Sequence, residues 1–413
     1  MVSERTAQKI RVAVCATHPI QYQAPLWRKL AAHSDLEVKV FYGTDMSVRG
    51  YQDEGFGVAV TWDAPLLESY ESIFLSTDPG IQRITTFSPS ARGLGKALKD
   101  FNPDVGLMVA YCNRFHMGVW RELRKLGVPI VMRHEATDVA HARSGFKARL
   151  RDAVLQKFYL TIRAFGVIGT EARQHLLRLG VAEQKMYSAP YIVDTDFVAG
   201  QVAFWLPQRD KLREEQKIPE EATVFVFSGK LIEKKDPLLI LAALRKVAED
   251  GVLSAGKIHL VIAGDGQLMP DLRKAVAEAG LTKQIHLLGF LNQAEVGRAY
   301  AVGDALILPS RRGSGETWGL VVNEGMHYGL PALVSDGVGC GPDLVQADKT
   351  GWIFSTGNVE ALAERMLQFA QLDRHGREQM HRAIKNLIQN YTLETVAGSL
   401  SAAFQSATKN HSP

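Results

Sequence analysis

Short, unbroken apolar runs alternate along the chain with longer segments whose apolar residues recur every three or four positions. Runs without polar alternation indicate strands buried on both faces, and the periodic segments between them indicate amphipathic helices. This alternation predicts an α/β fold with parallel, doubly wound sheets. The predicted strands fall at residues 11–16, 37–42, 105–110, 129–133 and 165–169 in the first half and at 223–229, 258–264, 285–289, 305–310, 331–335 and 351–355 in the second.

The two sets of strands predict two Rossmann-like domains. The polar run at 208–222 has no strand pattern and is interpreted as a helix with an entry loop to the second domain. We expect a first domain over 1–195, a second over 196–390, and a C-terminal helix over 391–413 that crosses back to the first. Ligands of open parallel sheets bind beyond the carboxyl ends of the strands, so the cleft between the two facing sheets is the expected site.

The composition is that of a soluble globular protein, since 46% of the 413 residues are hydrophobic and 22% are charged. No apolar run approaches the ~20 residues that a membrane-spanning helix needs. The three cysteines, Cys15, Cys112 and Cys340, are scattered, and we interpret them as free, buried thiols in a reducing compartment. These features predict a cytoplasmic protein.

The net charge of +4 is unevenly distributed. Residues 101–163 carry 11 Lys and Arg against 5 Asp and Glu. A solvated helical face is the simple interpretation. The alternative is a surface that attracts anionic lipid headgroups or a diphosphate-bearing substrate, which would make the protein peripheral on the inner face of the membrane. The stretch contains no recognisable nucleic-acid-binding module, so nucleic acid is not an expected partner.

Two glutamates, Glu316 and Glu324, are separated by seven residues, and a helix is predicted to begin between them. The first backbone N–H groups of a helix have no intrahelical partner, so such a helix start attracts phosphate. A carboxylate nearby can accept hydrogen bonds from sugar hydroxyls, and the segment therefore suits a nucleotide-sugar. Five neighbouring residues supply the candidate caps and the outward-pointing amides: Ser314, Thr317, Trp318, Gly319 and Leu320.

Basic and glycine-rich turns follow other strands of the second half. Lys230 and Lys235 stand five residues apart after Gly229, a spacing that can flank a diphosphate. Gly264 and Gly266 form a tight turn that can line a nucleotide, although the third glycine of a dinucleotide fingerprint is missing. Solvated lysines and purely structural turns are the alternatives. A further loop with the freedom to approach a sugar or phosphate contains Gly337, Gly339 and Gly341.

Taken in order, these pieces resemble the donor-binding domain of glycosyltransferase family 4, which has the GT-B architecture. The family pattern runs Gly-Arg-Leu, a Lys five residues after the Arg, Gly-Asp-Gly, Pro-Ser, and Glu-x-Phe-Gly-x-x-x-x-Glu. The resemblance extends over essentially the whole chain and is specific in the second half. The matching pieces here are Gly229-Lys230-Leu231, Lys235, Gly264-Asp265-Gly266, Pro309-Ser310, and Glu316-Thr317-Trp318-Gly319 through Glu324.

The resemblance implies a role for each matching residue. Lys230 and Lys235 would neutralise the donor diphosphate, and the helix start would meet a phosphate. Glu324 would hold the ribose hydroxyls, and Glu316 would bind the transferred sugar near the reacting carbon. The first domain would bind the acceptor and the second the nucleotide-sugar.

Three positions depart from the family pattern. Lys230 stands where the family has Arg, so the charge is kept but bidentate phosphate contact is lost. Trp318 replaces a Phe, and a core aromatic is its simpler interpretation. The border segment at 190–194 lacks the Asn-Gly of the family's Pro-Asn-Gly-Val-Asp, which predicts a stiffer linker.

Candidate residues in the first half follow predicted strands. His134 directly follows a strand, at a position that resembles the family's cleft His, which contacts the donor sugar; a packed His is the alternative. The family's Gly-rich acceptor loop is missing after the first strand. His18 and Gln21 stand there instead and are candidate acceptor contacts, with a structural turn at Pro19 as the alternative.

The resemblance implies a retaining glycosyltransferase that moves a sugar from a nucleoside diphosphate sugar to a hydroxyl of a glycan or lipid-linked acceptor, in polysaccharide or glycolipid assembly. The nucleotide-sugar is a co-substrate, and no cofactor is expected. No Asp-x-Asp pair is placed for a metal, so we predict metal independence. A GT-B UDP-sugar epimerase and a catalytically silent nucleotide-binding protein are the alternatives. The retained glutamates and lysines count against the silent protein, and the acid/base carboxylates expected of the epimerase cannot be placed.

Overall fold

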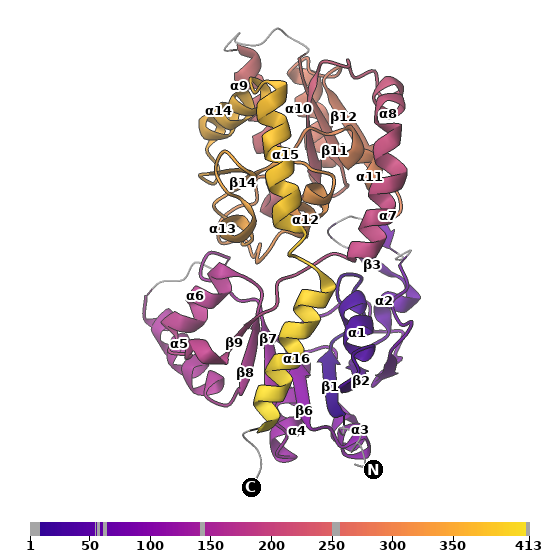
Figure 1. Cartoon of the computed structure of the whole chain (residues 1–413), viewed down its shortest axis with the longest axis vertical. Helices are drawn as coiled ribbons and strands as arrows, with labels where there is room; N and C mark the ends of the chain where they lie inside the picture. Colours follow the sequence, from indigo (N-terminus) through magenta and orange to yellow (C-terminus); the bar gives the residue numbers. More distant parts are fainter. Residues whose placement is uncertain are drawn as a thin grey trace, which may run out of the picture.

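Two parallel sheets, one in each half of the chain, organise the fold (Figure 1). The computed structural model describes residues 9–53, 55, 58–60, 64–140, 145–249 and 257–409. Within these ranges, none of the helices is both long enough and apolar enough to cross a bilayer.

The first sheet has seven parallel strands in the order β5-β2-β1-β6-β7-β8-β9. A small antiparallel hairpin, β3 (Tyr51–Asp53) and β4 (Val58–Val60), stands apart from the sheet. The strands are β1 (Ile10–Ala16), β2 (Leu36–Tyr42), β5 (Glu71–Phe74), β6 (Val105–Met108), β7 (Ile130–His134), β8 (Ala164–Val167) and β9 (Met186–Ser188). The helices are α1 (Ala24–Ala31), α2 (Met46–Arg49), α3 (Leu94–Phe101), α4 (Arg114–Lys125), α5 (Gly145–Tyr159) and α6 (Thr170–Arg178).

The second sheet has six parallel strands in the order β12-β11-β10-β13-β14-β15. The strands are β10 (Thr223–Ser228), β11 (Ile258–Ala263), β12 (Ile285–Gly289), β13 (Ala305–Leu308), β14 (Ala332–Ser335) and β15 (Gly351–Phe354). The helices around them are α9 (Pro237–Glu249), α10 (Met269–Glu278), α11 (Gly297–Val302), α12 (Leu320–His327), α13 (Gly341–Leu344), α14 (Val359–Ala370) and α15 (Arg374–Ile388).

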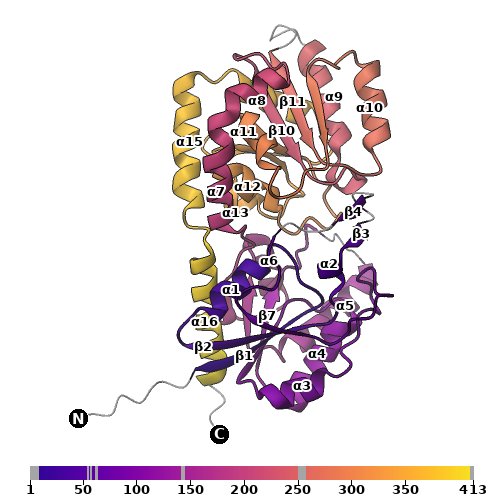
Figure 2. The ribbon, with the colours of Figure 1, turned by 90° about the vertical axis from the view of Figure 1, so that its right-hand side faces the viewer.

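The chain passes between the domains twice. After β9 it crosses to α7 (Thr195–Trp205), which leads through a 3₁₀ turn into α8 (Arg209–Glu215) beside the second sheet. After α15 it returns, and α16 (Leu393–Lys409) packs on α1, β8 and β9 of the first domain. Figure 2 shows α15 and α16 following one another along one side of both domains.

Both sheets are buried on both faces. In the first, α3, α4 and α5 cover one face while α1 and α16 cover the other. Strands such as β6, β7, β10 and β11 are buried throughout, which explains why the sequence shows them as continuous apolar runs.

The cysteine prediction is partly wrong. All three thiols are free, and Cys15 and Cys340 are buried, but Cys112 is exposed. Cys112 follows β6 at the carboxyl end of the strand, where the chain has left the sheet and entered the turn before α4.

Candidate functional site

The loops that carry the candidate residues lie at the carboxyl ends of the second sheet's strands. The lysine loop follows β10, the Gly264 turn follows β11, and the Glu316 loop follows β13 and leads into α12. In open parallel sheets, this edge is where ligands bind. Figure 2 shows the first domain facing the same edge of the second.

Lys235 and Glu316 form an ion pair at the centre of this edge. The Lys235 Nζ lies 2.5 Å from Glu316 Oε2, and the two side chains are only 15% and 9% exposed. Ser310 Oγ donates a hydrogen bond to the same carboxylate oxygen at 3.0 Å. The ion pair and the Ser310 hydrogen bond hold the Glu316 carboxylate in one position in the loop after β13.

Lys234 is a further cation that the sequence pattern did not single out. Its Nζ donates to the carbonyl oxygen of Gly315 at 2.8 Å and lies 4.0 Å from Glu316 Oε2. Burial lowers the pKa of Lys234, and the charge of Lys230 is near enough to lower it further, while Glu316 opposes both. The signal in the sequence that could have identified Lys234 is the pair of adjacent lysines after Glu233.

The electrostatics of this loop favour an anion. Burial alone would raise the pKa of the Glu316 carboxyl, but the charges of Lys235 and Lys234 outweigh it and lower the pKa below its ordinary value of 4.5. Glu316 is therefore ionised at neutral pH. The loop after β10 contributes three lysines, Lys230, Lys234 and Lys235, a composition that suits a diphosphate.

The helix start lies beside this pair. Helix α12 begins at Leu320, with Gly319 at the N-cap in a left-handed conformation of φ 109°, and no side chain among the described residues caps it. A Cβ at Gly319 would lie 2.9 Å from a methyl group of Leu308, so the position requires glycine. The expected cap Ser314 instead donates to the carbonyl oxygen of Arg311. The uncapped first-turn amides are suited to a phosphate.

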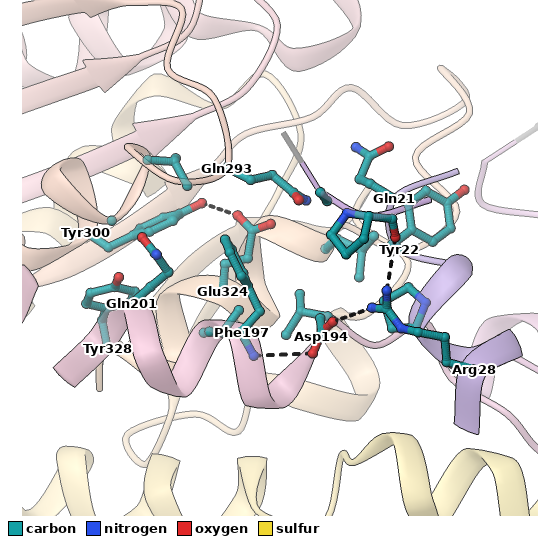
Figure 3. A pocket seen from close by; sticks show the side chains of 18 residues that line it. Gln21, Tyr22, Arg28, Asp194, Phe197, Gln201, Gln293, Tyr300, Glu324 and Tyr328 are labelled. Carbon is teal, nitrogen blue, oxygen red and sulfur yellow. Dashed lines mark hydrogen bonds and ion pairs between the residues drawn. The ribbon is translucent and has the colours of Figure 1, made fainter. Parts of the chain in front are cut away.

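Glu324, one turn into α12, lines a pocket between the two domains (Figure 3). Tyr300 donates a hydrogen bond to Glu324 Oε2 at 2.5 Å. Burial raises the pKa of the Glu324 carboxyl, and Tyr300 and Lys235 oppose that effect only in part. The pocket encloses about 770 Å³ including its open mouth. Polar side chains reach it from both domains: Gln21, Tyr22, Arg28, Asp194, Gln201, Gln293 and Tyr300.

An Asp-x-Asp sequence does occur at 194–196, beside this pocket. Asp194 accepts a hydrogen bond from Arg28 at 2.8 Å and caps α7 by accepting from the Phe197 amide at 3.2 Å. Its carboxylate therefore has structural partners. Across the described ranges, no group of three or more His, Cys, Asp or Glu side chains is arranged to hold a metal ion.

The glycine turns differ in what they face. A Cβ at Gly264 would lie 1.9 Å from the carbonyl oxygen of Gly229, and one at Gly266 would lie 2.8 Å from that of Gly55 in the first domain. A Cβ at Gly229, by contrast, would meet no described atom within 4 Å. The first two glycines permit close packing of chain on chain, and Gly229 leaves open space for a ligand.

The loop at 337–341 also packs on the chain. A Cβ at Gly339 would lie 2.0 Å from the carbonyl oxygen of Thr317, and one at Gly337 would lie 2.6 Å from that of Ser310. This loop therefore supports the backbone of the Glu316 segment.

His134 lies at the end of β7 and is only 1% exposed. Its ring stacks on His175 at 5.5 Å and meets the edges of Tyr159 and Phe165 at 5.5 and 6.1 Å. Burial, helped by the nearby His175, lowers the pKa of His134 to about 3, so the ring is neutral. Its contact with a donor sugar stays a prediction, and such a contact requires the ring to be uncovered.

The two candidates after β1 occupy different places. Gln21 lines the interdomain pocket together with Glu324 and Leu320. His18 is half-buried, and its Nδ1 lies 2.9 Å from the Thr17 hydroxyl. Burial lowers the pKa of His18 to about 4. Their roles as acceptor contacts stay predictions.

Trp318 lies at the domain interface. It is 3% exposed, and its Nε1 donates to Asn323 at 2.9 Å. A Cβ at Gly169 of the first domain would lie 2.5 Å from the Trp318 ring. Other contacts join the domains nearby, with the Gly313 and Gly315 amides donating to the Val139 and Ala140 carbonyl oxygens at 2.9 Å and Asp343 accepting from Thr170.

Comparisons with known proteins agree with this geometry. Residues 208–389 match the model of the family described as glycosyl transferases group 1. The chain is 31% identical over 160 residues to the putative colanic acid biosynthesis glycosyltransferase WcaL of Escherichia coli K12, which is 38% of each chain. It is 31% identical over 171 residues to the amylovoran biosynthesis glycosyltransferase AmsK of Erwinia amylovora, which is 41% of this chain and 39% of that one. The matches thus span less than half the length of these relatives.

The whole fold also has a close structural counterpart. The crystal structure of Anabaena Alr3699/HepE in complex with UDP superimposes with a TM-score of 0.69 at 13% identity, over 97% of this chain and all of that one. The two facing Rossmann-like domains are those of the GT-B architecture, so the predicted fold class is confirmed.

Proposed function

We propose that the chain transfers a sugar from a nucleoside diphosphate sugar to a hydroxyl acceptor, starting from the match of residues 208–389 to the family of group 1 glycosyl transferases. The observation that carries the proposal is the buried Lys235–Glu316 pair beside the uncapped start of α12. Lysine charge and helix amides suit a diphosphate, and a fixed carboxylate suits a sugar hydroxyl.

The proposed reaction retains configuration at the sugar. The bond between the anomeric carbon and the phosphate oxygen breaks, and the acceptor oxygen bonds to the same face of that carbon. The departing phosphate takes the acceptor's proton. Lys230, Lys234, Lys235 and the helix start stabilise the charge that develops on the leaving diphosphate, which is the largest catalytic contribution expected. Closure of the cleft excludes water and limits donor hydrolysis.

The nucleoside end of the donor is proposed to occupy the Glu324 pocket. The Glu324 carboxylate would accept hydrogen bonds from the ribose hydroxyls, and Tyr300 already orients it from the other side. Gln21 and Gln293 supply amide groups at the pocket wall. Glu316 would hold the transferred sugar, next to the diphosphate.

A thermal-shift screen tests the donor class. We expect one nucleoside diphosphate sugar from a panel of UDP, GDP and ADP sugars to raise the melting temperature, because a ligand that binds only the folded state stabilises it. The UDP-bound structural counterpart makes the UDP sugars the first to measure. A folded protein whose melting temperature none of the panel changes would contradict the proposed function.

Metal independence is a second proposal. The lysines and helix amides supply the positive charge that a divalent ion supplies elsewhere. We expect the transfer rate in EDTA to equal the rate in added Mg²⁺ or Mn²⁺, measured with the donor found by the screen. A rate that falls in EDTA and returns with added metal would refute it.

The acceptor is proposed to be a glycan or lipid-linked hydroxyl in polysaccharide or glycolipid assembly. The names of the two relatives, which concern colanic acid and amylovoran biosynthesis, support this class. An anionic membrane surface is the proposed partner of the basic stretch at 101–163, with the protein peripheral on the cytoplasmic face.

A further inference from the structure

Helix α5 presents an apolar row to solvent. Phe146, Leu150 and Val154 follow one another at intervals of four residues and are 79%, 58% and 59% exposed. Leu160, just beyond the helix, is 77% exposed. The opposite face of α5 is anchored in the first domain by the buried Leu155 and Tyr159. A helix that covers a sheet normally turns a polar face outward. The exposed apolar face of α5 is therefore suited to contact with another apolar surface.

The charges on this outer face are all positive. Lys147, Arg149 and Lys157 are exposed along it, and no ion pair is found for them among the described residues. The acid of the helix, Asp152, is turned to the side, where Arg178 binds it at 2.5 Å. Because Lys157 is three residues after Val154, it lies within the apolar row.

A basic hollow continues the face at its far end. Its walls include Leu160 together with Arg124, Arg163 and Lys185, and no described acidic residue lines it. The hollow is open to solvent, and its basic walls suit a phosphate-bearing headgroup. The apolar row and the hollow therefore form one continuous surface, here called the α5 face, that combines exposed apolar side chains with basic ones.

We infer that the α5 face lies on an anionic lipid bilayer. Apolar side chains interleaved with lysine and arginine are typical of helices that lie in the membrane interface, where lysine stems extend beside the apolar groups and their ammonium groups reach lipid phosphates. A protein partner or second copy of the chain would instead bury Lys157 among apolar side chains, and the cores of protein interfaces are depleted in lysine.

The orientation of α5 determines where a bilayer bound to it would lie relative to the cleft. The helix connects the carboxyl end of β7 to the start of β8, so its first turn, with Phe146, lies at the cleft side of the first domain (Figure 1). Ala140, five residues before α5, accepts a hydrogen bond from Gly315 of the second domain. A bilayer along α5 would therefore reach the cleft rim, where a lipid-borne acceptor could enter. The bilayer contact specifies where the proposed membrane partner binds, and its consequence for the acceptor rests on the proposed function.

Vesicle cosedimentation of the full chain tests the inference. We expect binding to phosphatidylcholine vesicles that contain phosphatidylglycerol, weaker binding at higher salt, and little binding to phosphatidylcholine alone. The double variant Phe146→Ser, Leu150→Ser should lower the partition coefficient at least tenfold. The variant Lys147→Gln, Arg149→Gln, Lys157→Gln should lower it about a hundredfold at low salt, since each cation near an anionic surface contributes about fivefold. Phe87→Ser is the matched control, because Phe87 is 77% exposed and lies outside the α5 face.

Three results would overturn the inference. The first is unchanged vesicle binding by both α5 variants, and the second is no vesicle binding by the unmodified chain. The third is a dimer in light scattering that the Phe146→Ser, Leu150→Ser variant dissociates, which would make the face an interface between copies. The donor-induced melting shift is measured in parallel on the same variants and should be unchanged. If no donor shifts the melting temperature of the unmodified chain while that chain still binds vesicles, the proposed function is rejected and the bilayer contact stands.

Discussion

Lys235→Ala is expected to slow sugar transfer by about 10² to 10³-fold. Removing one preorganised group that stabilises developing negative charge typically has an effect of this size. Lys235 also neutralises Glu316 at 2.5 Å, so its loss removes the partner that fixes the carboxylate proposed to bind the sugar. The measurement is the single-turnover rate with saturating donor, compared with the donor's dissociation constant.

Lys211→Ala serves as the control for this prediction. Lys211 lies in the same domain, its side chain is 72% exposed, and its nearest acid is Glu215 at 3.9 Å. We expect its loss to leave the rate unchanged. If Lys235→Ala is folded and transfers sugar at the unmodified rate, the diphosphate is not stabilised by this loop.

Glu324→Ala is expected to weaken binding of the donor nucleotide by about 10- to 100-fold. Hydrogen bonds that involve a charged group contribute about 1.5–3 kcal/mol each, and the ribose would lose the acceptor that α12 places in the pocket. Isothermal titration with the nucleoside diphosphate measures the effect. Glu364→Ala, an exposed glutamate on α14, is the control. Unchanged affinity and turnover in Glu324→Ala would reject the ribose assignment.

The same carboxylate predicts how donor binding depends on pH. The ionised form accepts the ribose hydrogen bonds, so affinity falls as the pH approaches the pKa of Glu324 from above. Burial raises this pKa, and the loss therefore begins at a higher pH than for an ordinary glutamate with a pKa of 4.5. Glu316, whose pKa is lowered, stays ionised over that range. Glu324→Gln should bind weakly without this pH dependence, and a profile that matches the unmodified chain would contradict the assignment.

Most of the fold could be predicted from the sequence because its strands are buried on both faces. All eleven strands predicted from apolar runs are found, with ends shifted by one or two residues. Four of the described strands were missed: β5 and β9 at the two edges of the first sheet, and β3 and β4 of the small hairpin. Each has only three or four residues, which is too short for a pattern to be distinguished from a loop.

The sequence could predict which candidate residues come together where they follow strand ends of one parallel sheet, because those ends meet at one edge. Lys235 follows β10 and Glu316 follows β13, and the structure pairs them. Their roles in donor binding stay predictions. The cage around His134 could not be foreseen, since His175 and Tyr159 come from two different helices. The same holds for the contacts between Gly169 and Trp318, which depend on how the two domains meet.

The two passages of chain between the domains lie on the same side of the molecule, where α7 begins and where α15 gives way to α16 (Figure 2). Ile192 of the first passage and Leu393 at the end of the second belong to one apolar cluster. Two adjacent connections let one domain rotate relative to the other about the line that joins the connections. They resist sliding or separation of the domains far more strongly. The pocket wall that contains Val193 and Asp194 lies on this axis and should change little in shape. The contact of Gly55 with Gly266 lies on the opposite side, beside the β3–β4 hairpin (Figure 2), and should open widest. The nucleoside would therefore bind to a half of the site that is already formed. The part of the site around the reacting end of the donor would come together only when the rotation of the domains is nearly complete.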